Sequence, residues 1–400
     1  MQRIYLDHAA TSWPKPEAVY RAVEHCLRKV GAPAGRGAYA EAVEASQIVS
    51  RTRRSITRLI GAADANHVIF THNGTDALNL ALHGLLDNGT DQTCRHVVTT
   101  VAEHNSVLRP LRHLELAGRI RVTRIGCDAA AVVALDAMRA AIDDDAYLVA
   151  VTHASNVTGA LQPIEAIAEL ARRAGALLLV DAAQTLGDVP IDVAALGVDL
   201  LAAPGHKGLL GPLGTGVLYV RPGIERQLAS IRQGGTGSDS QFDRQPETLP
   251  EKYEAGNLNV PAIAGLGAGV DYLLERGVSQ VREHGERLTS ELLEGLREIR
   301  GVRLYGPAAA RERVGIVSLT LAGCDPHELA AMLDGGLAVP GGYRIQARAG
   351  YHCAGAMHAD LGTLEMGGTL RFSLGAMSTS DEVSRAVHAM RVIAGSLVGT

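Results

Sequence analysis

The sequence predicts an α/β fold in which a mostly parallel sheet carries helices on both faces. Between residues 68 and 220, short apolar runs alternate with stretches of helical periodicity, as in chains of βαβ units. Glycine is abundant, at 45 residues, and aromatic residues make up only 4%, which fits many tight connections around such a sheet. The length of 400 residues predicts at least two domains.

The expected elements follow the chain in order. Strands are predicted at residues 68–71, 96–100, 120–125, 146–152, 177–180, 198–203 and 215–220, and helices between them at 77–86, 106–117, 135–142 and 163–174. The polar, glycine-rich residues 232–259 are expected to form a long loop. A smaller α+β unit should follow, with helices at 261–275, 281–299, 327–333 and 381–394 and strands at 314–321 and 369–374.

The composition is that of an ordinary globular protein. Hydrophobic residues make up 46% and charged residues 20%, the net charge is −5, and no basic tract indicates nucleic-acid binding. The N-terminus lacks the apolar run of a signal peptide, and no stretch approaches the roughly 18 apolar residues of a membrane span. We therefore expect a cytoplasmic protein that binds neither nucleic acid nor membrane.

The cysteines are odd in number and widely spaced, without a Cys-x-x-Cys pair. This spacing indicates neither a metal site nor a disulfide framework. In the cytoplasm, an exposed cysteine can be a reactive thiol. The five cysteines are Cys26, Cys94, Cys127, Cys324 and Cys353.

Lys207 and Asp181 are the first candidate site residues. Lys207 lies in a glycine-rich turn after one predicted strand, and Asp181 directly follows the apolar run 177–180. Ligands of open α/β sheets bind at the carboxyl ends of strands. A lysine there can form a Schiff base, and a carboxylate there can hold a pyridinium nitrogen. The alternatives are a surface lysine and an aspartate that caps the next turn.

Two further segments follow predicted strands and open helices. Gly74 and Thr75 offer backbone amides and a hydroxyl to a phosphate group, although a plain N-cap explains this segment too. His104 can stack on a planar cofactor or move protons. Alternatively, Asn105 or Ser106 caps the helix and His104 is merely exposed.

Asn156 and Arg371 are candidate ligand-binding residues. Asn156 follows the strand at 146–152 and can donate a hydrogen bond to a phenolate-type oxygen, although asparagine is also common in turns. Arg371 lies in the strand at 369–374, where a planar guanidinium can grip a carboxylate through two hydrogen bonds. Its alternative is a surface salt bridge of little energetic weight.

Cys353 stands in the polar segment Arg-Ala-Gly-Tyr-His-Cys-Ala-Gly at residues 348–355, which we expect to be an exposed loop. The neighbouring Arg348 and His352 would favour the thiolate. The alternative is a small buried residue, the commoner fate of a free cysteine. The loop context favours a reactive thiol.

These motifs are specific in combination. From Tyr-Leu-Asp-His-Ala-Ala-Thr at residues 5–11, through the segments of Asp181 and Lys207, to the Cys353 loop and Arg371, the chain resembles the class V aminotransferases of PLP fold type I. Within them it resembles the cysteine desulfurases and selenocysteine lyases. The Arg-x-Gly-x-His-Cys segment is similar to that of the Suf-type, or group II, enzymes.

The resemblance implies pyridoxal 5′-phosphate (PLP) as the cofactor. Lys207 matches the Schiff-base lysine, Asp181 the partner of the pyridine nitrogen, and His104 the histidine that stacks on the ring. Other positions match residues that contact the cofactor: Gln184 and Asn156 at the phenolic oxygen, and Gly74, Thr75 and His206 at the phosphate.

The resemblance also implies a substrate, a sulfur acceptor and an assembly. Arg371 matches the arginine that holds the substrate carboxylate, with Arg348 and Asn156 beside it. Cys353 matches the cysteine that takes sulfur from L-cysteine, or selenium from L-selenocysteine, for transfer to an acceptor protein or small thiol. Thr236 matches a segment that reaches the phosphate of the neighbouring subunit's cofactor, which implies a homodimer.

The implied architecture is a large domain at residues 15–262, with a seven-stranded sheet, and a small domain built from residues 1–14 and 263–400. Two positions depart from the family pattern. Pro204 stands where many relatives have a serine that binds phosphate, and proline has neither a hydroxyl nor an amide N–H. Tyr351 stands where Suf-type enzymes often have a second histidine.

The expected reaction is desulfuration of L-cysteine to L-alanine with a persulfide formed on Cys353. Selenocysteine lyase activity is the nearest alternative. C–S lysis, racemisation or transamination on the same scaffold would need no cysteine in the loop. A PLP-binding partner protein without catalysis is the non-enzymatic alternative.

Overall fold

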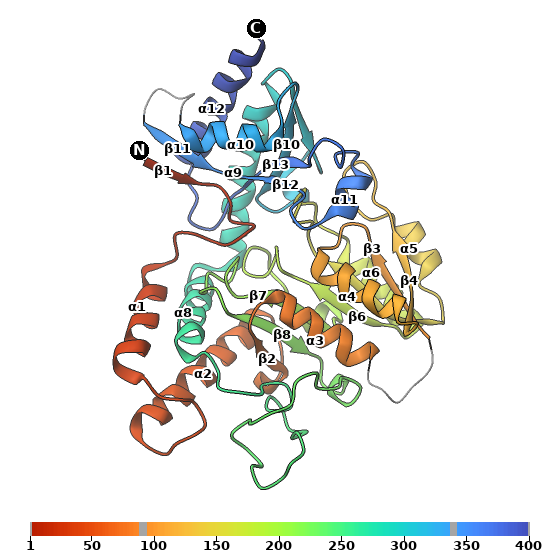
Figure 1. Cartoon of the computed structure of the whole chain (residues 1–400), viewed down its shortest axis with the longest axis vertical. Helices are drawn as coiled ribbons and strands as arrows, with labels where there is room; N and C mark the ends of the chain where they lie inside the picture. The colour runs from red at the N-terminus through yellow and green to blue at the C-terminus, as the bar shows by residue number, and fades with distance from the viewer. Residues whose placement is uncertain (1, 88–93, 337–341, 399–400) are drawn as a thin grey trace.

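A seven-stranded sheet forms the centre of the larger part of the molecule (Figure 1). The computed structural model describes residues 2–87, 94–336 and 342–398. In spatial order the strands are β2 (Val68–Thr71), β8 (Gly216–Val220), β7 (Leu200–Pro204), β6 (Leu177–Asp181), β5 (Ala146–Thr152), β3 (Arg95–Thr100) and β4 (Ile120–Ile125). The five strands from β7 to β4 are parallel, whereas β8 is antiparallel to both of its neighbours. The predicted mostly parallel sheet is confirmed.

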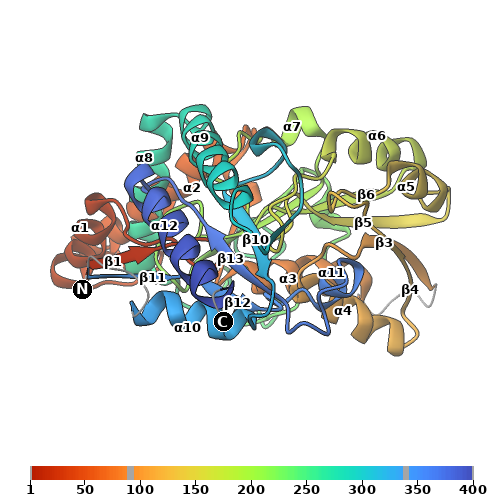
Figure 2. The same ribbon diagram turned by 90° about the horizontal axis from the view of Figure 1, so that it is seen from above.

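Helices cover both faces of this sheet because its strands are apolar on both sides. In β6, Leu178 and Val180 join one hydrophobic cluster and Leu179 joins another, as the alternation of side chains along a strand requires. Figure 2 shows the helices on opposite sides. They are α5 (Leu135–Ala141), α6 (Ile164–Ala174) and α7 (Val193–Leu196) on one face, and α3 (Gly74–Leu86) and α4 (Asn105–Leu116) on the other.

The N-terminal helices, together with α8 (Val260–Arg276), pack on the hydrophobic cluster that contains Leu178 and Val180. These N-terminal helices are α1 (Glu17–His25), the short π-helical turn η1 (Cys26–Val30) and α2 (Ala40–Leu59). A Cβ on Gly267 of α8 would lie 2.3 Å from Thr52 Oγ1 of α2. Glycine is therefore what allows these two helices to approach so closely.

The smaller unit has its own hydrophobic cluster, to which residues from both ends of the chain contribute. β1 (Gln2–Tyr5) pairs in parallel with β11 (Tyr343–Gln346). An antiparallel sheet is formed by β12 (Arg348–Gly350), β13 (Thr369–Ser373), β10 (Ile316–Leu321) and β9 (Val302–Tyr305). Its helices are α9 (Val278–Arg297), α10 (Pro326–Gly335), α11 (Gly355–Asp360) and α12 (Ser380–Val398).

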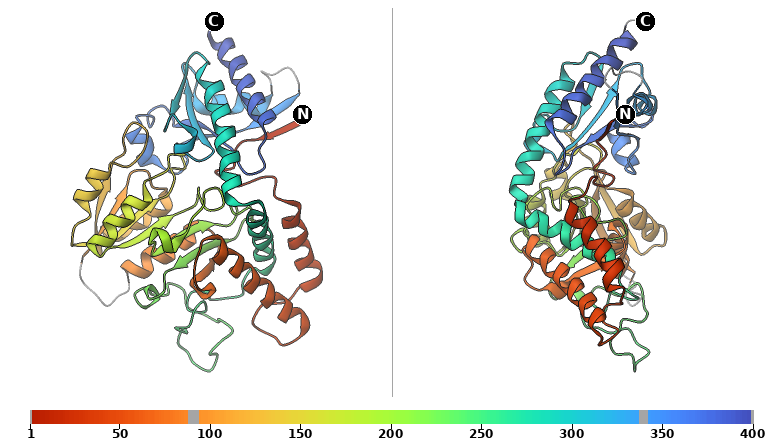
Figure 3. Two further views of the ribbon diagram at one scale, coloured as in Figure 1. Left: turned by 180° about the vertical axis from the view of Figure 1, so that it is seen from behind. Right: turned by 90° about the vertical axis from the view of Figure 1, so that its left-hand side faces the viewer.

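The long helix α9 connects the two units (Figure 3). It starts directly after Gly277, the residue that ends α8, and Leu288, Leu292 and Leu296 of α9 are buried in the smaller cluster. The residues of α8 pack in the larger cluster. The predicted domain limits at 14/15 and 262/263 stay a prediction, and residues 1 and 399–400 of the predicted small domain lie outside the described residues.

Each predicted element is present, with ends that differ by a few residues. No helix or strand occurs at 232–259, as expected of a loop. The sequence did not predict α1, α2, α7, α11, β1, β9, β11 or β12. In α2 the buried positions include polar residues such as Thr52 and Arg53, which hide the apolar stripe. Short 3-10 turns complete the chain at Ala65–His67, Ile224–Arg226 and Ala310–Glu312. Within the described residues, no helix has the length and apolar character needed to cross a membrane.

Candidate active site

One cavity lies where the ends of several parallel strands meet. Asp181 is the last residue of β6, and Lys207 lies in the turn after the adjacent strand β7. Both line a cavity of about 230 Å³. Most of the predicted site residues line it too: Gly74, Thr75, His104, Asn156, Gln184, His206, Arg348 and Arg371.

Lys207 is held in a turn that lowers the pKa of its amine. Leu210 N donates to Lys207 O at 2.9 Å, and Ser12 Oγ donates to the same oxygen at 2.9 Å. Burial lowers the pKa of Lys207 from 10.5 to about 8, and the nearby Asp181 carboxylate opposes this shift. Within the described residues, nothing accepts a hydrogen bond from Nζ, so the amine is available to a ligand.

Asp181 is 4% exposed, and its buried carboxylate has few partners. Oδ1 accepts a hydrogen bond from Ala183 N at 2.9 Å, so the predicted turn-capping alternative describes part of its environment. Burial raises the pKa of Asp181, whereas the bond from Ala183 and the charge of Lys207 lower it. A cationic N–H donor in the cavity would stabilise this carboxylate as the anion.

The N-termini of α3 and α4 meet at one end of the cavity. Asn73, rather than Thr75, caps α3, because its Oδ1 accepts a hydrogen bond from Asp76 N at 2.9 Å. Thr75 is therefore left to face the cavity, where its Oγ1 lies 2.7 Å from Ser106 Oγ. Ser106 appeared in the sequence only as a possible cap, yet it lines the cavity as well.

His104 is both the cap of α4 and part of the cavity wall. Its Nδ1 accepts a hydrogen bond from Ser106 N at 3.0 Å, so neither Asn105 nor Ser106 is the cap. Burial, followed by the charge of Lys207, lowers the pKa of His104 to about 4. The imidazole is therefore uncharged near neutral pH, as a ring that stacks on a cofactor should be.

Asn156 connects the cavity to the cysteine loop. Its Nδ2 donates to His352 O at 2.6 Å, its backbone oxygen accepts from Arg371 Nη1 at 2.9 Å, and its Oδ1 is buried without a partner among the described residues. One N–H of the amide remains free for a ligand. Gln184, on the same wall, donates from Nε2 to Ala9 O at 3.2 Å.

Arg348 and Arg371 are register partners on β12 and β13. Arg371 is 1% exposed, and its Nη2 forms a 2.9 Å salt bridge with Asp7. Burial lowers the pKa of Arg371 and Asp7 opposes the shift, but an arginine remains charged. Within the described residues, Arg348 has no acidic partner and Arg371 Nε has no acceptor. This pair of cations suits a carboxylate ligand.

Cys353 lies in an exposed loop between β12 and α11, as predicted. His352 and Cys353 have φ values of +49° and +61°, in the left-handed region that residues other than glycine rarely adopt. Asn105 N donates to Cys353 O at 2.9 Å, which fastens the loop to the start of α4. Cys353 Sγ lies 3.8 Å from Nη2 of Arg348, which lines the cavity, whereas Cys353 itself does not line it.

His352 differs from expectation. Because the loop turns it inward, burial, followed by Arg371, lowers the pKa of His352 to about 2. It is therefore neutral and contributes no positive charge to the thiol of Cys353. Its Nε2 lies 3.2 Å from Thr369 Oγ1, and the ring lines the cavity. Arg348 is the cation beside the thiol, and the sequence could not separate the two because both lie within five residues of Cys353.

Thr236 lies elsewhere. Its Oγ1 contacts Ser238 Oγ at 3.1 Å, and the adjoining Gly235 O accepts a hydrogen bond from Arg36 Nη2 at 2.9 Å. Thr236 lines a separate pocket of about 480 Å³ with Arg36 and Arg53. Its predicted role toward the cofactor of a neighbouring subunit therefore stays a prediction.

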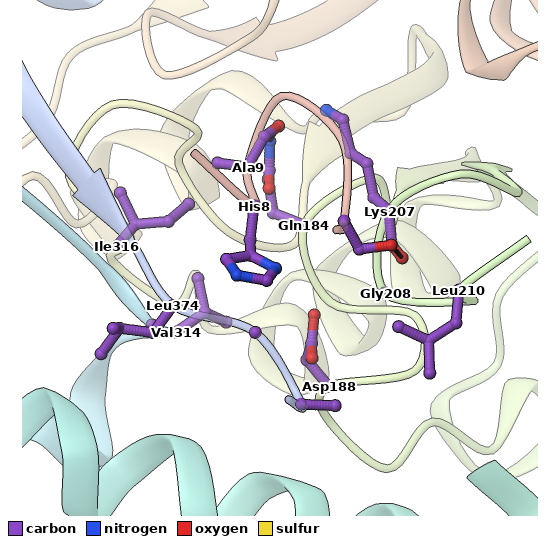
Figure 4. A pocket seen from close by; sticks show the side chains of 14 residues that line it. His8, Ala9, Gln184, Asp188, Lys207, Gly208, Leu210, Val314, Ile316 and Leu374 are labelled. Atoms are coloured by element: carbon purple, nitrogen blue, oxygen red, sulfur yellow. Dashed lines mark hydrogen bonds between the residues drawn. The ribbon is translucent and has the colours of Figure 1, made fainter. Parts of the chain in front are cut away.

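A smaller cavity, of about 30 Å³, adjoins Lys207 on the side of His8 and Asp188 (Figure 4). The view shows the amine of Lys207 pointing away from both residues. Burial lowers the pKa of His8 to about 4 and raises that of Asp188 to about 7. This space suits water rather than a cofactor, so the ligand chemistry belongs to the larger cavity.

The sequence is similar to a known protein family. The sequence model of the family described as Aminotransferase class-V matches residues 4–386. A probable cysteine desulfurase of Methanothermobacter thermautotrophicus is 36% identical over 396 residues, spanning 98% of this chain and 95% of the relative. A cysteine desulfurase of Yersinia pestis is 33% identical over 399 residues, spanning 98% of this chain and 93% of the relative.

Solved structures agree. The chain is similar to the apo form of a cysteine desulfurase from Thermococcus onnurineus, with a TM-score of 0.90 and 31% identity over 98% of this chain and 95% of the other. It is also similar to a cysteine desulfurase of Escherichia coli in an S-sulfonic acid form, with a TM-score of 0.86 and 27% identity over 98% and 94%.

Proposed function

Because this chain belongs to the class-V aminotransferase family, we propose that it is a PLP-dependent cysteine desulfurase. It converts L-cysteine to L-alanine and leaves the sulfur on Cys353 as a persulfide, which passes to an acceptor protein or small thiol. The observation that carries the proposal is the exposed thiol of Cys353 beside Arg348, next to a cavity that contains Lys207 and Asp181. The names of the relatives support the same reaction.

The cavity fits PLP. Its lining includes buried atoms that have no hydrogen-bond partner among the described residues: His206 Nδ1, Asn156 Oδ1, His352 Nδ1 and Arg371 Nε. Each such atom costs roughly 1–3 kcal/mol unless a ligand or water contacts it. Lys207 would hold the aldehyde carbon, Asp181 the ring N–H, and His104 one face of the ring. The remaining contacts would come from Gln184 and Asn156 at the phenolic oxygen, and from Gly74, Thr75 and His206 at the phosphate.

PLP, when bound, supplies an electron sink for the bonds around the substrate Cα. Lys207 removes the Cα proton, and its lowered pKa of about 8 makes the neutral amine accessible at a pH where an ordinary lysine is charged. Asp181 would accept a hydrogen bond from the N–H of the ring nitrogen, and a cationic ring would in turn keep the buried carboxylate ionised.

The two arginines orient the substrate. Arg371 is paired with Asp7, whereas Arg348 lacks an acidic partner among the described residues. A substrate carboxylate placed between them would add the missing negative charge. Holding it there positions the substrate Cα near Lys207 and the substrate sulfur near Cys353, which removes much of the entropic barrier.

The sulfur transfer is a displacement at the substrate sulfur. The Cys353 thiolate attacks that sulfur, an S–S bond forms, and the Cβ–S bond breaks with its electron pair passing to carbon. Cβ takes up a proton, Lys207 returns a proton to Cα, and the three-carbon product leaves as L-alanine. In sum, the enzyme thiol and the substrate C–S bond are exchanged for a persulfide and a C–H bond. No external oxidant is required.

We also propose that the enzyme is a cytoplasmic homodimer in which Thr236 of each subunit reaches the phosphate of the other's cofactor. The position of Thr236, outside the Lys207 cavity of its own chain, supports this assignment. Sedimentation of the PLP-loaded protein should give the mass of two chains, and a monomer that is fully active would contradict it.

The direct test incubates the PLP-loaded protein with L-cysteine and measures alanine and sulfide in the presence of a thiol. Equal amounts of the two products, with persulfide trapped on Cys353, are expected. Parallel turnover of L-selenocysteine decides between desulfurase and selenocysteine lyase. Pyruvate or D-cysteine as the product, without a persulfide, would instead indicate a lyase or a racemase.

A further inference from the structure

We infer that Ser106 is a positioning residue for the cofactor: its hydroxyl completes the phosphate seat across from Pro204 and connects that seat to His104. The inference rests on the proposed PLP site. Ser106 is 8% exposed and lines the cavity. Its Oγ lies 2.7 Å from Thr75 Oγ1 and 2.8 Å from His104 Nδ1, so one hydroxyl contacts both residues.

The location suits an anion. Thr75 and Ser106 are each the second residue of their helix, α3 and α4, so two positive helix ends and two hydroxyls converge on one end of the cavity. Pro204 lines the same end and packs closely on Gly74, where a Cβ would lie 3.0 Å from Pro204 Cδ. Because proline provides neither a hydroxyl nor an N–H, the hydroxyl donors at this end are those of Thr75 and Ser106.

The same contacts determine which nitrogen of His104 carries the proton. Ser106 N–H donates to His104 Nδ1 at 3.0 Å, so Nδ1 is unprotonated and the single ring proton is on Nε2. The hydroxyl of Ser106 has a single proton, so when it donates to a phosphate group the backbone N–H of Ser106 is the donor that still holds His104 Nδ1. His104 therefore presents an N–H donor to the cavity. It can bind a sulfur anion, but it cannot take the thiol proton at Nε2.

The test compares PLP with pyridoxal, which lacks the phosphate. PLP is removed from the purified protein, and the binding of each aldehyde to the apo chain is measured by equilibrium titration. We expect Ser106→Ala to weaken PLP binding about 10- to 100-fold, as loss of a hydrogen bond to a charged group does. Pyridoxal binding should not change. Adding Pro204→Ser to Ser106→Ala should restore most of the PLP affinity.

Ser55→Ala is the matched control. Ser55 is 7% exposed, and its hydroxyl donates to Asp271 Oδ1 at 2.6 Å, but it does not line the cavity. It should leave both affinities unchanged. Equal affinities of wild type and Ser106→Ala for PLP would overturn the inference and leave the proposed function intact. A wild-type protein that binds no PLP would overturn both the inference about Ser106 and the proposed function.

The proton assignment has its own readout. Nitrogen-15 NMR of the apo protein with labelled histidine should show an unprotonated Nδ1 and a protonated Nε2 for His104, identified by its absence in His104→Gln. Ser106→Ala keeps the backbone N–H and should keep this tautomer. A proton on Nδ1 in the wild type would overturn the assignment.

Discussion

The Lys207 turn and the Cys353 loop place their functional groups in opposite environments, one buried and one exposed. Lys207 is enclosed at the end of a buried strand, and burial lowers the pKa of its amine to about 8. Cys353 is exposed on the smaller unit. Activation of the substrate needs a dry site that shifts a pKa, whereas delivery of sulfur needs a thiol that an acceptor can reach. The two tasks are therefore carried by residues that follow strands of different sheets.

The two regions also differ in how their backbone is held. The Lys207 turn is closed by the hydrogen bond from Leu210 N and is tied to the N-terminal segment through Ser12 Oγ, and one of its residues, Leu210, has a left-handed φ of +60°. In the Cys353 loop two successive residues have left-handed φ, which costs roughly 1–3 kcal/mol per residue. The larger unit holds this loop through Asn105 N and Asn156 Nδ2. The loop conformation therefore depends on the contact between the units.

The largest effect should come from the lysine. Lys207→Ala should lower cysteine turnover at least about a thousandfold, because it removes both the covalent attachment and the base. The visible absorption of bound PLP should change, and borohydride should no longer attach the cofactor to the chain. Lys29→Ala, a change at an exposed lysine, should do neither. Unchanged turnover by Lys207→Ala would assign the chemistry to another residue.

The next largest effect should come from the cysteine. Cys353→Ser should lower sulfide release about a hundredfold or more, because serine cannot accept the sulfur. The PLP absorption and its response to L-cysteine should be retained, since Cys353 does not line the cavity. Mass spectrometry should find a persulfide in the wild type and in Cys324→Ser but not in Cys353→Ser. Full activity of Cys353→Ser would show that the sulfur acceptor does not lie in the Cys353 loop.

The arginines test how the regions cooperate. Arg371→Gln should raise KM for L-cysteine about 10- to 100-fold through loss of a charge-assisted contact. Arg348→Gln should raise KM less and should slow alkylation of Cys353 by iodoacetamide, because Arg348 contacts Sγ. If Arg371→Gln slowed alkylation more than Arg348→Gln, the assignment of the two arginines would be reversed.

The smallest effect concerns pH and stability. Burial lowers the pKa of the Lys207 amine from 10.5, its ordinary value, to about 8 in the folded apo chain. Between these values the unfolded state binds more protons, so the contribution of Lys207 to stability rises with pH. Below about pH 8 both states are protonated and the folded state bears the full burial cost. In urea unfolding experiments, the free energy of unfolding of the wild type should therefore rise relative to that of Lys207→Met between pH 8 and pH 10.5. A constant difference would mean that the amine is not buried.

Much of the fold was predictable because the strands of the large sheet are continuous apolar runs. The predicted strand at 146–152 and the structure's β5 have the same limits. Elements whose burial depends on neighbours were missed, such as the three-residue β12. The site residues after strand ends were predictable because parallel strands bring those ends together. Ser106 was not, since its role depends on a hydroxyl 31 positions away.

The sequence by itself determined the types of chemical group and their order: a lysine, an acid and polar residues after strand ends, and a cysteine in a polar loop. Only the tertiary structure decided their charge states and contacts. It made His352 neutral and left Arg348 as the cation beside Cys353, and it connected Thr75 to His104 through Ser106. The physical reason is that burial and electrostatic interaction depend on packing among residues distant in the chain, which no local pattern records.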